Sequence, residues 1–118
     1  MLKLPKRRIL RNKRTFQQVY KQGRSWANRY LVLYVFPAIG LERKAGFAAG
    51  KKLGHAVTRN RMKRIMRESY RKNQPWMKEG FWILLVARKG AVPVKQPVME
   101  KAFLDLGRRA GIFRQEAE

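Results

Sequence analysis

Apolar side chains recur at helical spacing in three stretches of the chain. In the first stretch Phe16, Val19 and Tyr20 stand at positions i, i+3 and i+4. Asn12 precedes them and can cap a helix, and Gly23 follows them and can end one. The pattern therefore predicts a short first helix.

Two longer helices are predicted further along the chain. One follows Thr58 and runs to about Lys72, and the other begins at Pro97 and ends at Gly111. The earlier of the two is amphipathic, with one arc for a core and the opposite arc polar and basic. The core arc comprises Met62, Ile65, Met66, Ser69 and Tyr70, and the opposite arc comprises Asn60, Lys63, Arg64, Arg67 and Arg71. In the last helix Val98, Ala102, Phe103, Leu106 and Ala110 keep helical spacing.

Runs of β-branched, aromatic and apolar residues predict three strands, over 30–36, 45–51 and 81–87. The stretch 37–44 contains a glycine and two charges and is predicted to be a hairpin loop between the first two strands. Small residues surround Phe47, so another element can pack closely there. The run 81–87 is apolar throughout and is predicted to be a central strand. The fold class is therefore α+β, an α/β sandwich with helices over a small sheet.

The 118 residues (13.9 kDa) suit a single domain. We expect one domain over residues 1–118, with a basic, partly extended arm over about 1–11 and a core over about 12–112. The 29 Lys and Arg residues against 7 Asp and Glu give a net charge of +22, while 45% of the residues are hydrophobic, as in globular proteins. A folded domain tolerates such self-repulsion when its partner is a polyanion, so the composition predicts nucleic-acid binding.

Several classes of protein are excluded by what the sequence lacks. Without Cys and with His55 as its one histidine, the chain cannot build a Cys/His zinc site, a thiol nucleophile or a disulfide. Its longest apolar run, 81–87, is shorter than the roughly 18 residues that span a bilayer, so we expect no membrane association and a cytoplasmic location. The basic stretch before Glu42, the first acid, also suits an organellar transit peptide, but its single serine and its strand disfavour that alternative.

The acidic residues form no recognisable catalytic arrangement. A two-metal nuclease needs converging carboxylates, and a nuclease of the paired-histidine type needs two imidazoles. None of the acids stands in such a motif, and His55 between Gly54 and Ala56 is typical of a loop position. The acids are Glu42, Glu68, Glu79, Glu100, Asp105, Glu116 and Glu118. We therefore predict no catalytic residue and assign no metal ligand.

The segment 51–64 is dense in basic side chains and favours specific binding of a polyanion. Arg binds phosphate oxygens through two parallel hydrogen bonds, and Lys supplies a point charge. The Asn60 amide can also accept a hydrogen bond from a ribose hydroxyl or a base edge. A solvated charged face is the alternative, but such faces usually mix Glu with Lys, and only Glu68 interrupts this one.

Aromatic side chains form a second pattern. Phe16 and Tyr20 are one helical turn apart, and Tyr30, Val32, Tyr34 and Phe36 alternate onto one face of the first predicted strand. Aromatic rings on a sheet and a neighbouring helix can stack with unpaired bases when basic residues flank them. The flanking candidates are Lys51, Lys52, Arg88 and Lys89. By pattern alone, a buried core is the favoured alternative for these rings.

The block 51–68, Lys-Lys-Leu-Gly-His-Ala-Val-Thr-Arg-Asn-Arg-Met-Lys-Arg-Ile-Met-Arg-Glu, closely resembles the signature of the bacterial ribonuclease P protein component. The Arg-Asn-Arg sequence that opens a basic helix is the hallmark of that family. Phe16-x-x-Val-Tyr20-x-x-Gly23, the block 28–34 and Val86-Ala87-Arg88-Lys89 resemble its first helix, first strand and third strand end. The resemblance covers roughly residues 5 to 112.

This resemblance implies a fold and an activity that the pattern alone does not give. It implies the order α-β-β-β-α-β-α, with a small mostly antiparallel sheet and a left-handed βαβ crossover around the basic helix, as in ribosomal protein S5 domain 2-like folds. It implies removal of the 5′ leader from precursor tRNA by a catalytic RNA that this protein assists. Mg²⁺ would be held mainly by that RNA, and the implied partners are the ribonuclease P catalytic RNA and precursor tRNA, with no small-molecule substrate and no membrane.

The resemblance also implies roles for individual residues. Those that match the helix that docks on the catalytic RNA are Arg59, Asn60, Arg61, Lys63, Arg64 and Arg67. Those that match the cleft for the single-stranded leader and its basic surroundings are Phe16, Tyr20, Tyr34, Lys51, Lys52, Arg88 and Lys89. The chain has Tyr20 where the family often has Phe, and His55 where Asn is common.

Two other classes of protein share part of this pattern. A small basic ribosomal protein would have the same charge and size. A helix-turn-helix regulator would place the basic helix in the DNA major groove. The second class needs a helix directly before Gly54, where the sequence predicts a strand, so the first is the stronger alternative.

Overall fold

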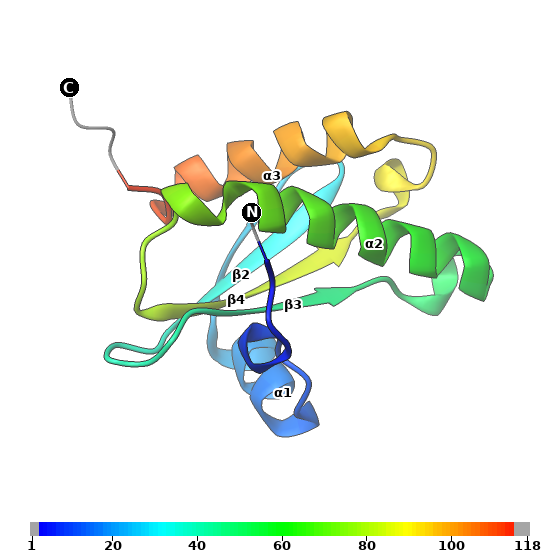
Figure 1. Ribbon diagram of the computed structural model, residues 1–118. Helices are drawn as coiled ribbons and strands as arrows, with labels where there is room; N and C mark the ends of the chain where they lie inside the picture. The colour runs from blue at the N-terminus through cyan, green and yellow to red at the C-terminus, as the bar shows by residue number, and fades with distance from the viewer. Residues whose placement is uncertain (1–2, 115–118) are drawn as a thin grey trace.

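The computed structural model describes residues 3–114, which form a sheet with helices on both faces (Figure 1). The main elements are α1 (Lys13–Gln22), β1 (Arg24–Ala27), β2 (Leu31–Pro37), β3 (Lys44–Ala48), α2 (Ala56–Asn73), β4 (Phe81–Ala87) and α3 (Gln96–Ala110). Short 3-10 helices in the connections are η1 (Lys6–Arg8), η2 (Lys51–Leu53), η3 (Gln74–Trp76) and η4 (Lys89–Ala91). Residues 1 and 2 of the predicted arm lie outside the described residues, and so do the acids Glu116 and Glu118.

The four strands pair in the order β1-β2-β4-β3. β2 is antiparallel to both of its neighbours, and β3 runs parallel to β4. The predicted central position of 81–87 is therefore confirmed. The hairpin predicted over 37–44 is wrong, because β4 lies between β2 and β3 and the loop joins strands that are not neighbours. The apolar run of β4 takes the middle position, where one of its faces is fully buried and the other is half-buried apart from the buried Leu84.

The short strand β1 is absent from the pattern-based prediction. Its residues Arg24, Ser25 and Ala27 are exposed, and only Trp26 packs against the main core. A four-residue edge strand with one inward side chain carries too little alternation to be recognised. With β1 included, the order α-β-β-β-α-β-α implied by the resemblance is confirmed. The hand of the β3-α2-β4 crossover stays a prediction.

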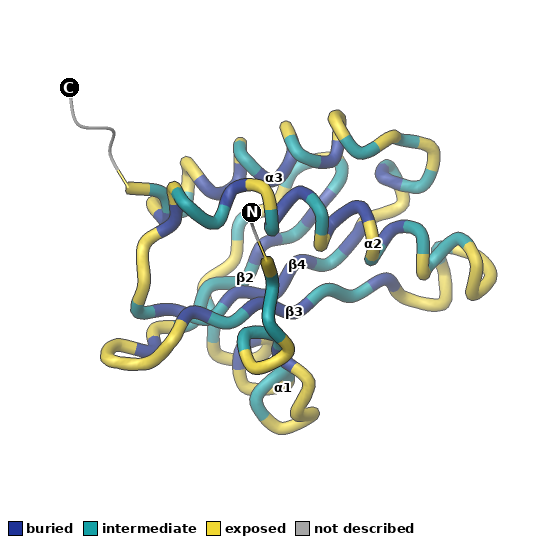
Figure 2. The backbone as a smooth tube through the Cα atoms, viewed as in Figure 1, coloured by how far each residue is buried: buried dark blue, intermediate teal, exposed yellow. Residues whose placement is uncertain are grey.

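The two faces of the sheet contribute to two separate cores. On one face the sheet is covered by α2 and α3, and Figure 2 shows buried residues on these helices and on the strands beneath them. The fully buried strand residues there include Leu31, Leu33, Ile83 and Leu85. Side chains on the opposite face meet α1 and the N-terminal arm in a smaller core of Leu10, Val19 and Leu84. Burying a side chain of this size contributes about 1.5–3 kcal/mol. The side chains of β2 and β4 that surround this small core are only half-buried, so this face of the sheet is partly covered.

The predicted core arc of α2 is confirmed, since Met62, Ile65, Met66, Ser69 and Tyr70 are all buried. The helix starts earlier than predicted, at Ala56 instead of after Thr58. Gly54 has a φ of 134°, which side-chain-bearing residues rarely adopt, and it turns the chain sharply. His55 then stands at the N-cap position with extended backbone, and its carbonyl accepts from the Arg59 N–H at 3.0 Å.

Helix α3 ends as the sequence predicts. Gly111 has the left-handed φ of 73° and caps the helix through bonds to the carbonyls of Gly107 and Arg108. The buried face of α3 begins one residue later than predicted, because Val98 is 38% exposed whereas Met99 is fully buried. Within residues 3–114, no helix is long and apolar enough to cross a membrane.

The described part of the N-terminal arm is held against the sheet. The Leu10 N–H donates to the Ala45 carbonyl at 2.8 Å, and the Leu10 side chain is buried over Gly46. A Cβ added at Gly46 would lie 3.2 Å from the Leu10 Cβ, so the glycine lets the arm approach. The close approach predicted beside Phe47 is thus confirmed.

Replacing Gly107 in α3 by alanine should destabilise the fold although alanine favours helices. A Cβ at this position would overlap the Phe113 ring, which itself packs edge-on against Phe103. Overpacking costs about 1–3 kcal/mol, more than the gain of up to about 1 kcal/mol in helix propensity. Urea unfolding should show a lower free energy for Gly107→Ala. Gly50→Ala, where the added Cβ meets open space, is the control and should unfold like the parent.

Candidate RNA interface

Four basic residues that are far apart in the sequence gather at one end of the sheet. Because β3 and β4 are parallel, with Ala48 opposite Val86, the segments that follow both strands leave the sheet at the same edge. The basic residues there are Lys51 and Lys52 in η2, and Arg88 and Lys89 after β4. All four are exposed. The strand predicted over 45–51 is therefore too long, because β3 ends at Ala48 and Lys51 begins a 3-10 helix.

Arg29 also lies at this end of the sheet, and no pattern in the sequence singles it out. β2 is antiparallel to β4, so the residues before Leu31 lie beside those after Ala87. The Arg88 N–H donates to the Tyr30 carbonyl at 2.8 Å, and the Arg88 guanidinium donates to the Asn28 carbonyl at 2.8 Å. We call Arg29, Lys51, Lys52, Arg88 and Lys89 the basic end.

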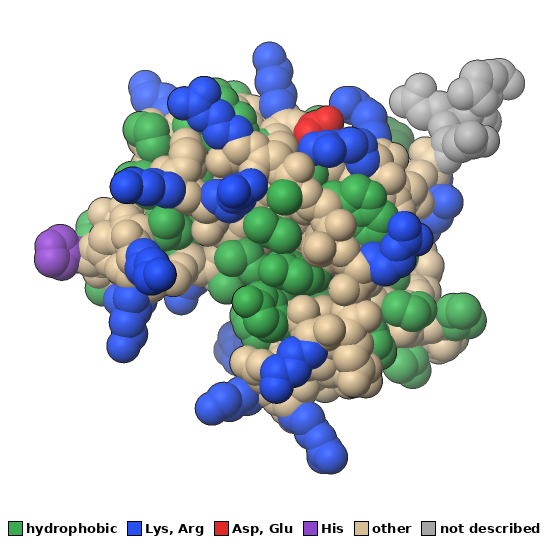
Figure 3. Space-filling view, turned by 180° about the vertical axis from the view of Figure 1, so that it is seen from behind, with side chains coloured by type: hydrophobic (Ala, Val, Ile, Leu, Met, Phe, Trp, Pro, Cys, Tyr) green, Lys and Arg blue, Asp and Glu red, His purple; other side chains and the backbone are tan. Residues whose placement is uncertain are grey.

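The partly covered face of the sheet forms a groove that leads to the basic end. Register places Tyr34 opposite Leu84, and Val32 opposite Val86, on the face that α1 covers. Seen from behind, hydrophobic side chains gather where the surface is hollowed next to the lower lobe formed by α1, and Lys and Arg surround the hollow (Figure 3). We call this face, with Val32, Tyr34 and Val86 as its floor, the groove.

The three aromatic residues predicted to form a stacking site do come together on α1 and β2. The Tyr20 and Tyr34 ring centroids are 5.1 Å apart with an interplanar angle of 47°. Tyr20 is 49% exposed, whereas Phe16 and Tyr34 are half-buried against the small core. Burial, and next the neighbouring Tyr20, raise the pKa of Tyr34, so it stays neutral at physiological pH. Phe16 and Tyr34 are thus part of a small core, Tyr20 stays exposed beside them, and the stacking of bases on these rings stays a prediction.

The outward face of α2 presents the basic residues of the predicted docking helix. Asn60, Arg64 and Arg67 are exposed, and the guanidinium of Arg67 lies 5.7 Å from the Phe47 ring centroid. Arg59 and Lys63 are half-buried. Arg59 lies in the first turn of α2, and its Nε is buried without a hydrogen-bond partner among the described residues.

Arg61 differs from the other predicted docking residues. Its guanidinium donates to the carbonyl of Val94 at 2.8 Å and to that of Val92 at 3.3 Å, in the loop before α3. Two of its donors are therefore already used within the protein. No spacing rule reveals this contact, because it joins residues more than thirty positions apart.

Comparison with known proteins agrees with this geometry. The family model described as Ribonuclease P matches residues 4–111 of the chain. The chain belongs to the ribonuclease P protein family. It is 42% identical over 108 residues to the ribonuclease P protein component of Symbiobacterium thermophilum, with 91% of this chain and 94% of the relative covered. The corresponding protein of Natranaerobius thermophilus is 36% identical over 100 residues, covering 85% of this chain and 87% of that protein.

Solved structures of ribonuclease P proteins share the fold. The Staphylococcus aureus protein superposes with a TM-score of 0.82 at 28% identity, covering 91% of this chain and 98% of that one. The Thermotoga maritima protein gives a TM-score of 0.76 at 30% identity, covering 85% and 94%. The chain is thus a protein component of the endoribonuclease ribonuclease P, which processes tRNA 5′ ends with an RNA subunit. The alternative of a small ribosomal protein is not favoured.

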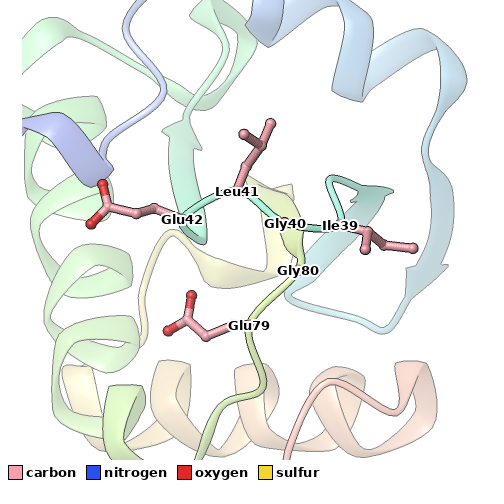
Figure 4. A pocket seen from close by; sticks show the side chains of 6 residues that line it. All are labelled: Ile39, Gly40, Leu41, Glu42, Glu79 and Gly80. Carbon is pink, nitrogen blue, oxygen red and sulfur yellow. The ribbon is translucent and has the colours of Figure 1, made fainter.

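The carboxylates of this ribonuclease P protein are engaged by basic side chains. Each of the five acids in residues 3–114 forms an ion pair of 3.4 Å or less. Glu42 and Glu79 line an open depression at the end of the sheet opposite the basic end (Figure 4), where Arg7, Arg8 and Arg43 bind them. The described residues contain no group of three acidic or histidine side chains that could hold a metal ion.

Arg43 is the most buried of these basic partners. It is 3% exposed, and its guanidinium donates to the Tyr70 hydroxyl at 2.9 Å, to the Lys78 carbonyl at 3.0 Å and to Glu79 at 3.0 Å. Partial burial would raise the pKa of Glu79, but the Arg43 backbone N–H and charge, with Arg8, lower it below its ordinary value. The ionised carboxylate is therefore favoured in the folded state.

Acid should weaken the fold through Glu79, and Glu79→Gln should remove that part of the effect. The native pKa lies below the unfolded one, so this stability is present above the unfolded pKa and is lost as the pH falls through the native pKa. We expect Glu79→Gln to be less stable than the parent at neutral pH and to approach it in acid. Urea titrations across this range would measure the gap. A gap that stays constant with pH would contradict the prediction.

Proposed function

We propose that this protein assists tRNA 5′ processing by binding two RNAs on two surfaces. The outward face of α2 binds the catalytic RNA subunit through Arg59, Asn60, Lys63, Arg64 and Arg67. The groove and the basic end bind the single-stranded 5′ leader of precursor tRNA. The observation that carries the proposal is the parallel pairing of β3 with β4, which places Lys51, Lys52, Arg88 and Lys89 next to the groove.

The leader suits this groove because single strands expose both their bases and their backbone. A base can stack on the exposed ring of Tyr20 or beside Phe16, while the basic end attracts the phosphates. The hydroxyl of Tyr20 adds a polar tip that a phenylalanine would not have. The mature tRNA body has no such unpaired 5′ extension, so the groove distinguishes precursor from product.

The protein's charge would lower the electrostatic cost of bringing two RNAs together. Substrate and RNA subunit are both polyanions and repel each other, and a surface with a net charge of +22 between them replaces many counterions. Clamping the leader would also fix the scissile phosphate relative to the RNA subunit. The protein then positions the substrate and leaves bond cleavage to RNA.

We assign Mg²⁺ to the RNA subunit. No three carboxylates of the described residues come together, and the two that share a depression, Glu42 and Glu79, are both bound by Arg8, which disfavours a metal site in this part of the protein. RNA phosphate oxygens are the hard ligands that Mg²⁺ prefers. The bound ions would activate water and stabilise the leaving oxygen. We place the protein in the bacterial cytoplasm.

Tyr20→Ala should weaken binding of precursor tRNA to the reconstituted holoenzyme by about 1–3 kcal/mol, the contribution of one base stack. Affinity for mature tRNA should stay unchanged, because the product has no leader. Tyr20→Phe keeps the ring and serves as the matched control, with precursor affinity close to that of the parent. Equal losses for precursor and mature tRNA would contradict the leader site.

Removing charge from the outward face of α2 should weaken assembly with the RNA subunit. We expect the double variant Lys63→Gln with Arg64→Gln to reduce the slope of log K against log salt by about 0.7–0.9 for each lost phosphate contact. Filter-binding titrations at several salt concentrations would measure the slope. Lys101→Gln with Arg108→Gln removes the same charge from exposed positions of α3. If both double variants had the same effect, α2 would not be the docking helix.

A further inference from the structure

The loop between β4 and α3, residues 88–95, carries two residues of the basic end and contacts α2 through Arg61. Arg61 donates from Nη2 to the Val94 carbonyl and from Nη1 to the Val92 carbonyl. Both acceptors are half-buried, and the side chains of Val92 and Val94 pack against the main core. A planar guanidinium can bind two neighbouring carbonyls at once, whereas a lysine ammonium is a single point charge.

The same loop is held from its other side by the segment before β2. A Cβ added at Gly90 would lie 2.6 Å from the Arg29 carbonyl oxygen, so the two backbones are in close contact. Within the loop, Ala91 is fully buried and the Val92 N–H donates to the Lys89 carbonyl at 3.1 Å. Arg88 and Lys89 therefore project from a short turn that is fixed between Arg29 and Arg61.

We propose that Arg61 is a positioning residue that holds the 88–95 loop at the groove, and is not a phosphate ligand of the RNA subunit. It acts on the leader through Arg88 and Lys89, whose backbone it fixes from the side of α2. This inference rests on the proposed function of the groove. It separates Arg61 from Arg59, Asn60 and Lys63 on the same helix, and it links the helix that docks on RNA to the leader site.

The test compares Arg61→Lys, which keeps the charge and loses the double hydrogen bond, with Arg64→Lys, a control at an exposed position one turn further along α2. In the free protein, hydrogen exchange of peptides covering residues 88–95 should be faster in Arg61→Lys and unchanged in Arg64→Lys. In the holoenzyme, Arg61→Lys should reduce the preference for precursor over mature tRNA by about twofold to thirtyfold, the range of coupling through packed contacts.

Assembly with the RNA subunit is the second readout. Under the proposal, Arg61→Lys assembles like the parent, and Arg61→Gln leaves the salt slope of assembly unchanged, although it removes a charge. A phosphate ligand would instead lower that slope by about 0.7–0.9. Circular dichroism and urea unfolding would verify that both variants are folded before either comparison is made.

Three results would overturn the proposal. Unchanged exchange over residues 88–95 in Arg61→Lys would show that the contact does not hold the loop. Faster exchange with an unchanged precursor preference would show that the loop does not act on the leader. A lower salt slope in Arg61→Gln would make Arg61 a phosphate ligand. Failure of the proposed function has a separate signature, since the parent protein itself would then show no preference for precursor tRNA while the loop still responded to Arg61→Lys.

Discussion

Repulsion among positive side chains is the constraint on which this structure depends. With 29 basic against 7 acidic residues, the chain can neutralise few of its charges internally. The acids that the structure describes all form ion pairs. Two of them, Glu42 in the loop before β3 and Glu79 in the turn before β4, bind arginines of the arm, and Glu79 also binds Arg43. Most remaining cations stay on the surface, where a polyanion relieves their repulsion.

Strand pairing turns this surplus of charge into a defined surface. η2 and the loop after β4 are separated in the sequence by the whole of α2, and they meet because β3 is parallel to β4. The antiparallel β2 brings Arg29 to the same place. α1 covers only part of the sheet face, so aromatic rings there contribute to a core and remain accessible from the groove.

The parts of the fold that the sequence predicts are those with strong local patterns. The buried arc of α2 and the apolar run of β4 need no knowledge of distant contacts, and Asn12 caps α1 as expected, accepting from the Arg14 N–H at 2.8 Å. The edge strand β1 has too few inward side chains to show alternation. The hairpin prediction fails because strand order is a non-local property that adjacent strands in the sequence do not determine.

The candidate site shows the same division. Charge and helical periodicity predict the outward face of α2, and the resemblance supplies the aromatic and basic residues of the groove. The hydrogen bonds from Arg61 to the carbonyls of Val92 and Val94 cannot be predicted from the sequence. In the sequence Arg61 is one of several arginines on a basic helix, and only the fold shows that two carbonyls lie beside it. Residue type predicts what a side chain can bind, and only the fold determines which partner it meets.

The central claim is that this protein positions RNA while RNA performs the cleavage. The most direct measurement combines the purified protein, a bacterial ribonuclease P RNA and precursor tRNA at low Mg²⁺, and follows release of the 5′ leader. The account predicts leader release only when protein and RNA subunit are both present. Release of the leader by the protein freed of all nucleic acid would contradict it.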